Sequence, residues 1–425
     1  MLNLVFGFLG LVLSLLTPVD RVENDLGELV LLATDSGYEE HLQTYCNIAN
    51  GVTIDLGFLN RTEYDEVTNI ASVGGGALWN TAYEAAAEHG VSLVGSRAGG
   101  VGVGGFLLGG GNSYYTGQRG FGCDNVVNYE VVLPDGNIIN ANATSNEDLY
   151  RALKGGGSNF GIVTWFDLEA FAAKDLYGGS RIITTNYTDE VLNAVVSFAN
   201  HDESQAADSF TPTFIYNTAI SPDVIIDASI LNVQGVRNST GFNRITTIPA
   251  VSEDLQSRNL VTIAAESTVD ANPTVLRRVV ERWNNFVTQL QQAMPADDFQ
   301  TQMNFQHLPT FYGRTVRGGN VLGLDSGLTD NSVPWVNIVN VQTADQESVA
   351  RLLTNTLRAE LEDFAISQGS SARLHYLNSA EPSQDPLGGY GVDNVKFIRN
   401  VVAKYDPKGL FQTRVPGGFR ISRVD

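Results

Sequence analysis

Residues 99–111 read GGVGVGGFLLGGG, with eight glycines in thirteen positions. Glycine lets the backbone approach a ligand closely and adopt positive φ. Successive bare N–H groups in such a loop can form a concave nest that binds an anion without any Lys or Arg. Apolar residues flank the run, and Phe106, Leu107 and Leu108 lie within it, so we expect it to be buried. The run therefore indicates a loop that holds a phosphate-bearing ligand.

The composition supports a backbone cradle and excludes several partners. The 425 residues carry a formal net charge of −21, with 43% hydrophobic and 17% charged residues. Such a chain is long enough for two or three folded domains. Its acidity disfavours nucleic acid and anionic membrane surfaces as partners, because phosphate contacts need clustered Lys and Arg. A small-molecule ligand is the expected partner.

Two nucleotide-binding motifs are rejected for the glycine run. Residues 100–105 satisfy G-x-G-x-x-G, but a Rossmann fold needs a helix to begin there, and the following LLGGGNS is not expected to sustain one. A Walker A loop needs Gly-Lys-Ser/Thr, and the nearby Lys154 precedes its glycines instead. A purely structural packing role remains the alternative, although so many glycines would weaken a fold that gained nothing from them.

The N-terminus and the glycosylation sequons predict a secreted protein. Leu4 to Leu16 is uncharged, apolar and too short to span a bilayer, which is typical of a signal peptide, here assigned to residues 1–19. Four Asn-x-Ser/Thr sequons begin at Asn60, Asn142, Asn186 and Asn238. Cys46 and Cys123 can either pair or remain buried thiols, and the five scattered histidines predict no metal site.

The pattern of predicted strands and helices changes near residue 180. Residues 47–172 alternate short strands with helices, and the pattern over 77–89 predicts a helix stopped by Gly90. Beyond residue 180, strand patterns are interrupted by two amphipathic helices predicted at 275–294 and 349–366. We expect a sheet covered by helices on one face. A last helix is predicted at 395–405, before Asp406-Pro407.

Four blocks of sequence, in order, resemble one family of flavoproteins. They are GVTIDLG, GSRAGGVGVGGFLLGGGNSYYTGQRGFGCDNVVNYEVVLPDG, DLYRALKGGGSNFGIVT and YGVDNVKFIRNVVAKYDPKGLFQTRVPGGF. Together they resemble the vanillyl-alcohol oxidase/p-cresol methylhydroxylase flavoproteins, and more closely the fungal berberine-bridge-enzyme-like oxidoreductases. Spaced blocks of this kind are far more specific than any one glycine motif.

The resemblance implies a bilobal α+β fold with a split FAD-binding domain. Residues 20–175 would form an FAD-binding domain whose N-terminal part is incomplete. Residues 176–380 would form a substrate domain with a mainly antiparallel sheet covered by helices, and residues 381–425 would return to the FAD domain. The implied chemistry is hydride transfer from an alcohol, sugar or secondary metabolite to flavin N5, with reoxidation by O₂.

The resemblance also implies the site residues. Those that would hold FAD are Gly99, Gly100, Val101, Gly102, Gly104, Gly105, Gly157, Asn159, Phe160, Gly161, Val163, Tyr390 and Asn394. For Phe160 and Val163, plain core packing is an equal alternative. Tyr376 and Asn378 match the first part of a Tyr-x-Asn-Tyr motif near the family's active site and are the candidate catalytic residues. For Tyr376 a purely packed role is the alternative.

Three departures from the family pattern bear on flavin binding and catalysis. Residues 21–46 contain no Gly-Gly-His loop, whose histidine often bonds the flavin covalently, and His41 lies near that place without the glycines. Ala98 stands where bicovalent members have cysteine, which excludes a cysteinyl bond. Ser379 replaces the second tyrosine of the motif and is a far weaker base. We therefore expect any bound FAD to be non-covalent.

Two alternatives to the oxidoreductase follow from these departures. A paralogue that keeps the fold but binds flavin weakly or not at all would also show this pattern. A glycoprotein whose acidic, β-rich half binds carbohydrate is a third hypothesis, which predicts an aromatic platform. The visible spectrum of the purified protein separates a flavoprotein from both.

Overall fold

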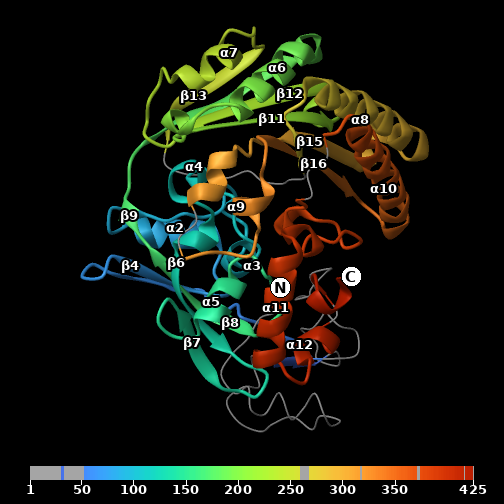
Figure 1. Cartoon of the computed structure of the whole chain (residues 1–425). Coiled ribbons are helices and arrows are strands. Elements are labelled where there is room, and N and C mark those ends of the chain that lie inside the picture. The colour runs from blue at the N-terminus through green and yellow to red at the C-terminus, as the bar shows by residue number, and fades with distance from the viewer. Residues whose placement is uncertain are drawn as a thin grey trace.

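Two lobes of antiparallel sheet with covering helices make up the molecule (Figure 1). The computed structural model describes residues 30–32, 52–258, 268–315, 318–370, 374–415 and 417–424. Residues 1–29 and 33–51 lie outside the described part, and with them the predicted signal peptide, His41, Cys46 and all of residues 21–46 except 30–32. β1 (Val30–Leu32) and β2 (Val52–Ile54), which lie before and after residues 33–51, form an antiparallel pair.

The first lobe holds the residues for which the resemblance implies an FAD-binding domain (the described part of 52–175 and 381–424), so we call it the FAD lobe; it is built on a five-stranded antiparallel sheet. Its order is β3-β4-β8-β6-β7, with bounds Thr62–Asp65, Ile70–Gly74, Ile162–Glu169, Val126–Val132 and Ile138–Asn142. A further short pair joins β5 (Val91–Ser92) to β9 (Phe171–Ala172). The helices of this lobe are α2 (Trp79–Ala87), α3 (Val103–Leu108), α4 (Thr116–Arg119) and α5 (Glu147–Leu153).

The predicted helix over residues 77–89 is confirmed as α2, and Gly90 follows it at φ +69°. A short helix, α3, begins at Val103 inside the glycine run but ends at Leu108, so the prediction that LLGGGNS (residues 107–113) does not sustain a helix is confirmed beyond Leu108. The backbone N–H of Val103 donates to the carbonyl of Ala77, and Phe106 and Leu107 are buried, so tertiary contacts outweigh the low helix propensity of glycine. The Rossmann fold stays excluded, since every strand pair of this sheet is antiparallel.

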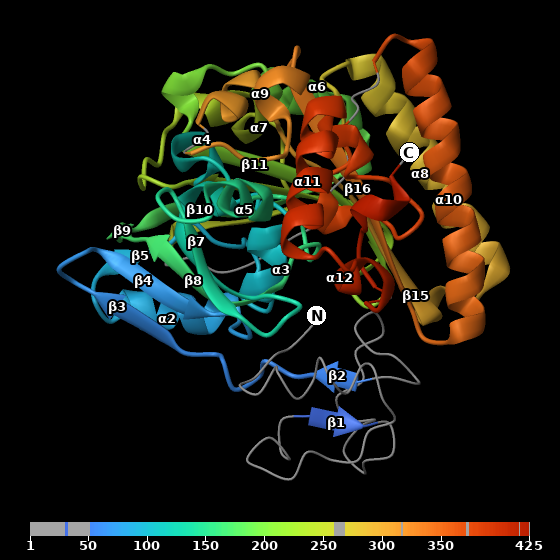
Figure 2. The ribbon, with the colours of Figure 1, turned by 60° about the horizontal axis from the view of Figure 1, so that its bottom comes forward.

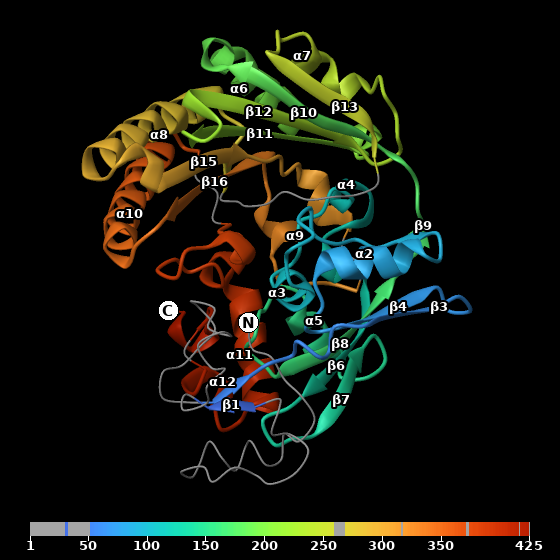
Figure 3. The ribbon, with the colours of Figure 1, turned by 180° about the vertical axis from the view of Figure 1, so that it is seen from behind.

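A seven-stranded antiparallel sheet forms the second lobe. Its order is β13-β10-β12-β11-β15-β16-β14, with bounds Ser252–Arg258, Leu176–Thr184, Ser221–Asn232, Asp208–Asn217, Phe299–Phe305, Ser332–Val341 and Thr268–Asp270. Its covering helices are α6 (Thr188–Ala199), α7 (Asn243–Thr246), α8 (Pro273–Ala293) and α10 (Ala344–Ser367). Figure 3 shows these helices on the outer face and the FAD lobe toward the other, as the sequence predicts.

Alternation along the strands assigns the two faces of this sheet. In β11 every second residue is buried from Phe210 onward, and Phe214 belongs to the helix-side core together with Met303, Trp335 and helix residues such as Trp283. The residues between them therefore point to the opposite face, toward the FAD lobe. Figure 2 shows α8 and α10 running side by side along this sheet. Both match the predicted amphipathic helices. Helix α8 begins two residues before its predicted start and ends one residue before its predicted end, and α10 begins five residues earlier and ends one residue later than predicted.

The C-terminal segment returns to the FAD lobe through α11 (Val392–Tyr405) and α12 (Leu410–Thr413). Lys404 Nζ lies 2.7 Å from Asp148 Oδ2 on α5, and the Tyr405 hydroxyl donates to the same carboxylate. Ile398 and Val401 complete the core of this lobe, so the FAD domain is split around the second lobe. The same core also takes in Leu308, Phe311, Tyr312, Val321, Leu322 and Leu324 from within the second lobe's span.

Candidate functional site

The first half of the glycine run is an open backbone surface. Gly100 and Gly105 are exposed, and a Cβ built on either would meet no described atom within 4 Å. The amides of Gly104 and Gly105 stand in the first turn of α3 and donate to no carbonyl of the described residues. A hydrogen bond from the N–H of Trp79 to the carbonyl of Val101 attaches the loop to the start of α2. This half can therefore take a ligand against bare backbone.

The second half of the run is filled by the protein itself. A Cβ at Gly109 would stand 1.8 Å from Oδ1 of Asn378, and one at Gly111 would stand 2.6 Å from the ring of Phe106. Gly110 and Gly111 have φ of +111° and +88°, whereas no glycine of residues 99–105 has positive φ. The left-handed backbone expected of the run is thus confined to its end. These glycines serve the approach of residues 376–378 rather than a ligand.

Tyr376 and Asn378 meet the glycine run directly. The Tyr376 hydroxyl accepts hydrogen bonds from the backbone N–H groups of Gly111 and Asn112, both at 2.7 Å. Asn378 Nδ2 donates to the same hydroxyl at 3.1 Å and to the carbonyl of Phe106 at 2.9 Å. Three N–H groups therefore converge on one phenol oxygen. The structure brings the two candidate catalytic residues together with the predicted ligand loop.

The Gly157–Val163 segment lies next to the glycine run, but most of its polar groups are hydrogen-bonded within the protein. The N–H of Gly157 donates to the carbonyl of Leu108, which ties this segment to the end of α3. Both atoms of the Asn159 side-chain amide are bonded within the protein: Nδ2 to the carbonyls of Gly156 and Phe419, and Oδ1 to the N–H of Ile421. Asn159 thus holds the C-terminal segment in place.

Three further predicted contacts of this segment lie in the interior. Phe160 and Val163 belong to the core of the FAD lobe. A Cβ at Gly161 would stand 2.7 Å from Cγ1 of Val131, so close packing against β6 requires glycine there. Direct contact of these residues with a flavin stays a prediction.

Tyr390 and Asn394 lie in a buried polar cluster with α5. The Tyr390 hydroxyl donates to the carbonyl of Gly155 at 2.9 Å, and burial raises the pKa of Tyr390 well above its ordinary value. Asn394 Oδ1 accepts from Nη2 of Arg151 at 2.8 Å, while its Nδ2 donates to the carbonyl of Tyr390 at 3.2 Å. Tyr390 is therefore a neutral, fixed hydroxyl. That Tyr390 and Asn394 contact a bound FAD stays a prediction.

Sequence reasoning misses a polar cluster that joins the two lobes. Gln306 follows β15, and its Oε1 accepts from Nη2 of Arg97 and from Nδ2 of Asn112 at 3.1 Å. The guanidinium of Arg97 also lies 5.7 Å from the ring centroid of Tyr114. Arg97 and Asn112 flank the glycine run in sequence, which is the signal that could have identified them. Nothing in the sequence of β15 distinguishes Gln306.

A polar row crosses the inner face of the second lobe's sheet. Asp227 pairs with Thr213, and Thr213 pairs with Asn304, in the register of three adjacent strands. Asn304 is 3% exposed, and its Oδ1 has no partner among the described residues. Burial raises the pKa of Asp227, although hydroxyl groups of Ser180 and Ser229 bond its carboxylate. Such a row can bind polar groups of a ligand held between the lobes.

The electrostatics elsewhere point to packing rather than chemistry. Burial lowers the pKa of His201 to about 4 and that of His307 well below its ordinary value, so both are neutral imidazoles among Phe198 and Phe311. Cys123 is a buried free thiol whose pKa is raised by burial. Among the described residues no group of three or more His, Cys, Asp or Glu side chains could hold a metal ion. None of the described helices combines the length and apolarity needed to cross a bilayer.

Comparison with known proteins defines the class. The family described as "FAD binding domain" matches residues 29–142. FAD-dependent monooxygenase drtC of Aspergillus calidoustus is 32% identical over 94% of this chain and 79% of its own length. FAD-dependent monooxygenase sdcF of Emericella nidulans is 33% identical over 89% of this chain and 82% of its own.

Solved structures show the same fold at low identity. 6-Hydroxy-D-nicotine oxidase from Arthrobacter nicotinovorans has a TM-score of 0.73 at 16% identity, covering 92% of this chain and 98% of that one. Chitooligosaccharide oxidase has a TM-score of 0.67 at 18% identity, covering 87% and 82%. The fold and the site define an FAD-dependent oxidoreductase with an FAD-binding domain of the p-cresol methylhydroxylase type. The chain belongs to the family of fungal FAD-dependent monooxygenases and FAD-linked oxidoreductases.

The open half of the glycine run fits FAD. Because Gly100 and Gly105 carry no side chain, a pyrophosphate can come close to their backbone. The amides of Gly104 and Gly105 can donate hydrogen bonds to it without a net positive charge. Gly99 and Gly102 are buried next to this surface, and the carbonyl of Gly99 accepts from the N–H of Asn80 on α2. The FAD would therefore lie along residues 99–105, with Tyr376 and Asn378 fixed at the far end of the same run.

Proposed function

We propose that this protein is a secreted FAD-dependent oxidoreductase that oxidises an alcohol, a sugar or a secondary metabolite. The observation that carries the proposal is the convergence of Tyr376 and Asn378 on the glycine run whose other half is open to FAD. Bound non-covalently, FAD would accept hydride from a substrate carbon at N5 and pass the electrons on to O₂.

Tyr376 is the residue that would take the proton released when the substrate is oxidised. Its oxygen is surrounded by N–H groups of Gly111, Asn112 and Asn378, which stabilise negative charge at that atom. Asn378 orients the phenol, since its own side chain is fixed on the carbonyl of Phe106. Ser379, which replaces the family's second tyrosine, need not serve as the base in this arrangement.

The substrate would bind between Tyr376 and the inner face of the second lobe's sheet. Gln306 links that face to the glycine run through Asn112 and Arg97. Asn304 Oδ1, two residues earlier on the same face, is a buried acceptor that can be satisfied by a substrate hydroxyl. Polar, hydroxyl-bearing small molecules suit this lining better than purely apolar ones.

Flavin reduction tests the proposal. The purified holoprotein is mixed without oxygen with a panel of benzylic alcohols, mono- and oligosaccharides and phenolic metabolites, and flavin bleaching is followed; readmitted O₂ should restore the colour and yield H₂O₂. We expect at least one hydroxylated compound to bleach wild type and not Tyr376→Phe at a comparable rate. A bound flavin that only artificial reductants bleach would contradict catalysis and favour the non-catalytic paralogue.

Secretion is proposed from the sequence and is compatible with the exposure of three sequons. Asn60, Asn186 and Asn238 are exposed, so each can carry a glycan. Asn142 is different, because its Nδ2 donates to Asn128 and its Oδ1 closes a turn with Thr144 and Ser145. Protein recovered from the medium of the producing cells should lose mass on treatment with an N-glycosidase. Retention inside the cells with no such loss would contradict the proposal.

A further inference from the structure

One segment carries both candidate catalytic residues from the second lobe back to the FAD lobe. It runs from Leu374 to Gly391, between α10 and α11. Its polar contacts with the FAD lobe include those of Tyr376 and Asn378 with the glycine run and that of Tyr390 with Gly155. Helix α10, by contrast, belongs to the second lobe and packs against α8 and β16.

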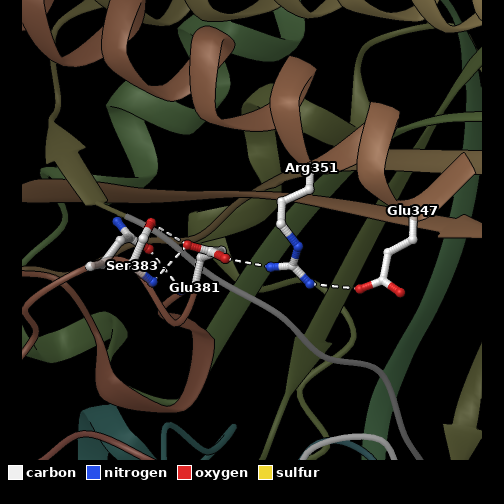
Figure 4. Close-up of polar contacts among 5 residues, drawn as sticks. Glu347, Arg351, Glu381 and Ser383 are labelled. Carbon is white, nitrogen blue, oxygen red and sulfur yellow. Dashed lines mark hydrogen bonds and ion pairs between the residues drawn. The ribbon is translucent and has the colours of Figure 1, made fainter. Parts of the chain in front are cut away.

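The segment is held to α10 immediately after Asn378. Arg351 Nη1 lies 2.5 Å from Glu381 Oε1, and Nη2 of the same guanidinium lies 2.7 Å from Glu347 Oε1, one turn earlier on α10 (Figure 4). The other oxygen of Glu381 accepts from the backbone N–H of Ser383 at 2.8 Å and from its hydroxyl. Burial raises the pKa of Glu381, but the Ser383 and Arg351 bonds outweigh this and hold it below its ordinary value. We call the Arg351–Glu381 contact the downstream clamp.

A second contact holds the segment immediately before Tyr376. His375 Nε2 lies 3.5 Å from Glu362 Oε1 on α10, and the contact is ionic when the imidazole is protonated. Oε2 of Glu362 is bonded by Nη1 of Arg358 at 2.8 Å. Burial raises the pKa of Glu362, while the bonds from His375 and Arg358 lower it further than burial raises it. We call the His375–Glu362 contact the upstream clamp.

The two clamps share one face of α10. Arg351 and Glu362 are eleven residues apart on this helix, which is three turns, so their side chains point the same way about 16 Å apart along the axis. They grip residues 375 and 381, which bracket Tyr376 and Asn378. A helix of the second lobe therefore holds both ends of the short stretch whose middle bonds the glycine run.

We infer that α10 positions Tyr376 and Asn378 against the glycine run through these clamps, with Arg351 and Glu362 as positioning residues. The inference rests on the proposed function of Tyr376. Neither residue bonds the glycine run, so their effect passes through the segment. Because α10 packs on the sheet whose inner face adjoins the site, a shift of that sheet would move Tyr376 relative to the flavin loop.

Isolated, partly exposed ion pairs often contribute little to stability, so the test must read position rather than stability. The backbone N–H groups of Gly111 and Asn112 report the position directly, because their partner is the Tyr376 hydroxyl. Hydrogen–deuterium exchange of a peptide covering residues 109–113 is measured on the full-length holoprotein by mass spectrometry. Tyr376→Phe removes the acceptor and sets the exchange expected when the bond is lost.

The variants are Arg351→Ala, Glu362→Gln, their combination, and the conservative Arg351→Lys. Arg277→Ala on α8 is the matched control, because Arg277 is 41% exposed, close to the 37% of Arg351, and pairs with Asp189 on α6 rather than with the segment. We expect each clamp variant to speed exchange at residues 109–113 by about fivefold, the effect of one well-placed ion pair. The combination should approach Tyr376→Phe, Arg351→Lys should stay near wild type, and β6 and β8 should be unchanged. With any substrate that bleaches the flavin, kcat should fall more than KM rises.

Three results would overturn the inference. The first is unchanged exchange at residues 109–113 in the combined variant while Tyr376→Phe speeds it. The second is a rise of equal size in β6 and β8, which would mean general destabilisation. The third is wild-type exchange in Tyr376→Phe itself, which would also remove the hydroxyl bond on which the proposed role of Tyr376 depends.

Discussion

Replacing Gly105 by alanine should separate flavin binding from folding. Gly105 lies in the first turn of α3 with a negative φ, and its Cβ would meet no described atom within 4 Å. Alanine is the better helix former by about 1 kcal/mol, so the apoprotein should unfold at slightly higher urea. If FAD lies against this backbone, the added methyl overpacks the interface at a cost of about 1–3 kcal/mol.

That cost corresponds to a dissociation constant for FAD raised about 5- to 150-fold. The assay is titration of apoprotein with FAD by flavin fluorescence, paired with urea unfolding of the same preparation. Gly109→Ala is the control, because its Cβ would stand 1.8 Å from Asn378 Oδ1 and should destabilise the fold instead. Wild-type affinity for FAD in a stable Gly105→Ala protein would refute the assignment of residues 99–105 to the flavin.

Three other outcomes are expected. Tyr376→Phe should keep its flavin but reduce it about 10²- to 10⁴-fold more slowly in stopped flow, the usual worth of a positioned base; an unchanged rate would exclude Tyr376 as the base. The pKa of His201 is about 4 in the folded protein against about 6.5 unfolded, so the unfolded chain takes up the proton first as pH falls. The contribution of His201 to the free energy of unfolding should therefore be fully present above pH 6.5, fall by about 3 kcal/mol between pH 6.5 and pH 4, and stay constant below that. Urea titration at several pH values measures it. The loss should be absent in His201→Phe, and an equal loss in that variant would contradict the assignment to His201. Asn238→Gln should remove one glycan from secreted protein by mass spectrometry, whereas an unchanged mass would show that this sequon is not used.

The helices of the second lobe could be predicted because their apolar positions repeat at helical spacing. The residues Val279, Val280, Trp283 and Phe286 of α8 all lie in the helix-side core, as their period indicates. Helix α3 could not be predicted, because four glycines lie in or next to its six residues and local propensity argues against it. What forms it is tertiary: burial of Phe106 and Leu107 and the bond from Val103 to Ala77.

The sequence predicts individual residues of the candidate site, but not the long-range contacts that bring them together. Composition alone predicts a ligand loop at the glycine run, whereas Tyr376 and Asn378 are predicted from the family resemblance. That their side chains fill the space left by Gly109 depends on a contact across 269 residues of chain, for which no local pattern exists. Asn304 could not be predicted because strand register, not residue type, places it on the face toward the FAD lobe, and Gln306 follows directly after that strand.

The two clamps on α10 could not be predicted from the sequence either. Arg351 and Glu347 read as an ordinary i, i+4 pair on an exposed helix face, and that pair is present. The additional partner, Glu381, is brought to the same guanidinium only by the return of the segment after α10. Long-range polar contacts of this kind follow from topology.

The central claim, that this chain is a flavoprotein with a non-covalently held FAD, is tested most directly by one absorption measurement. The purified protein is scanned in the visible range, precipitated with acid, and the pellet and supernatant are scanned again. The account predicts flavin bands in the native protein and their complete transfer to the supernatant. A protein that is colourless and stays so after incubation with FAD would contradict the claim, and colour kept in the pellet would contradict non-covalent binding.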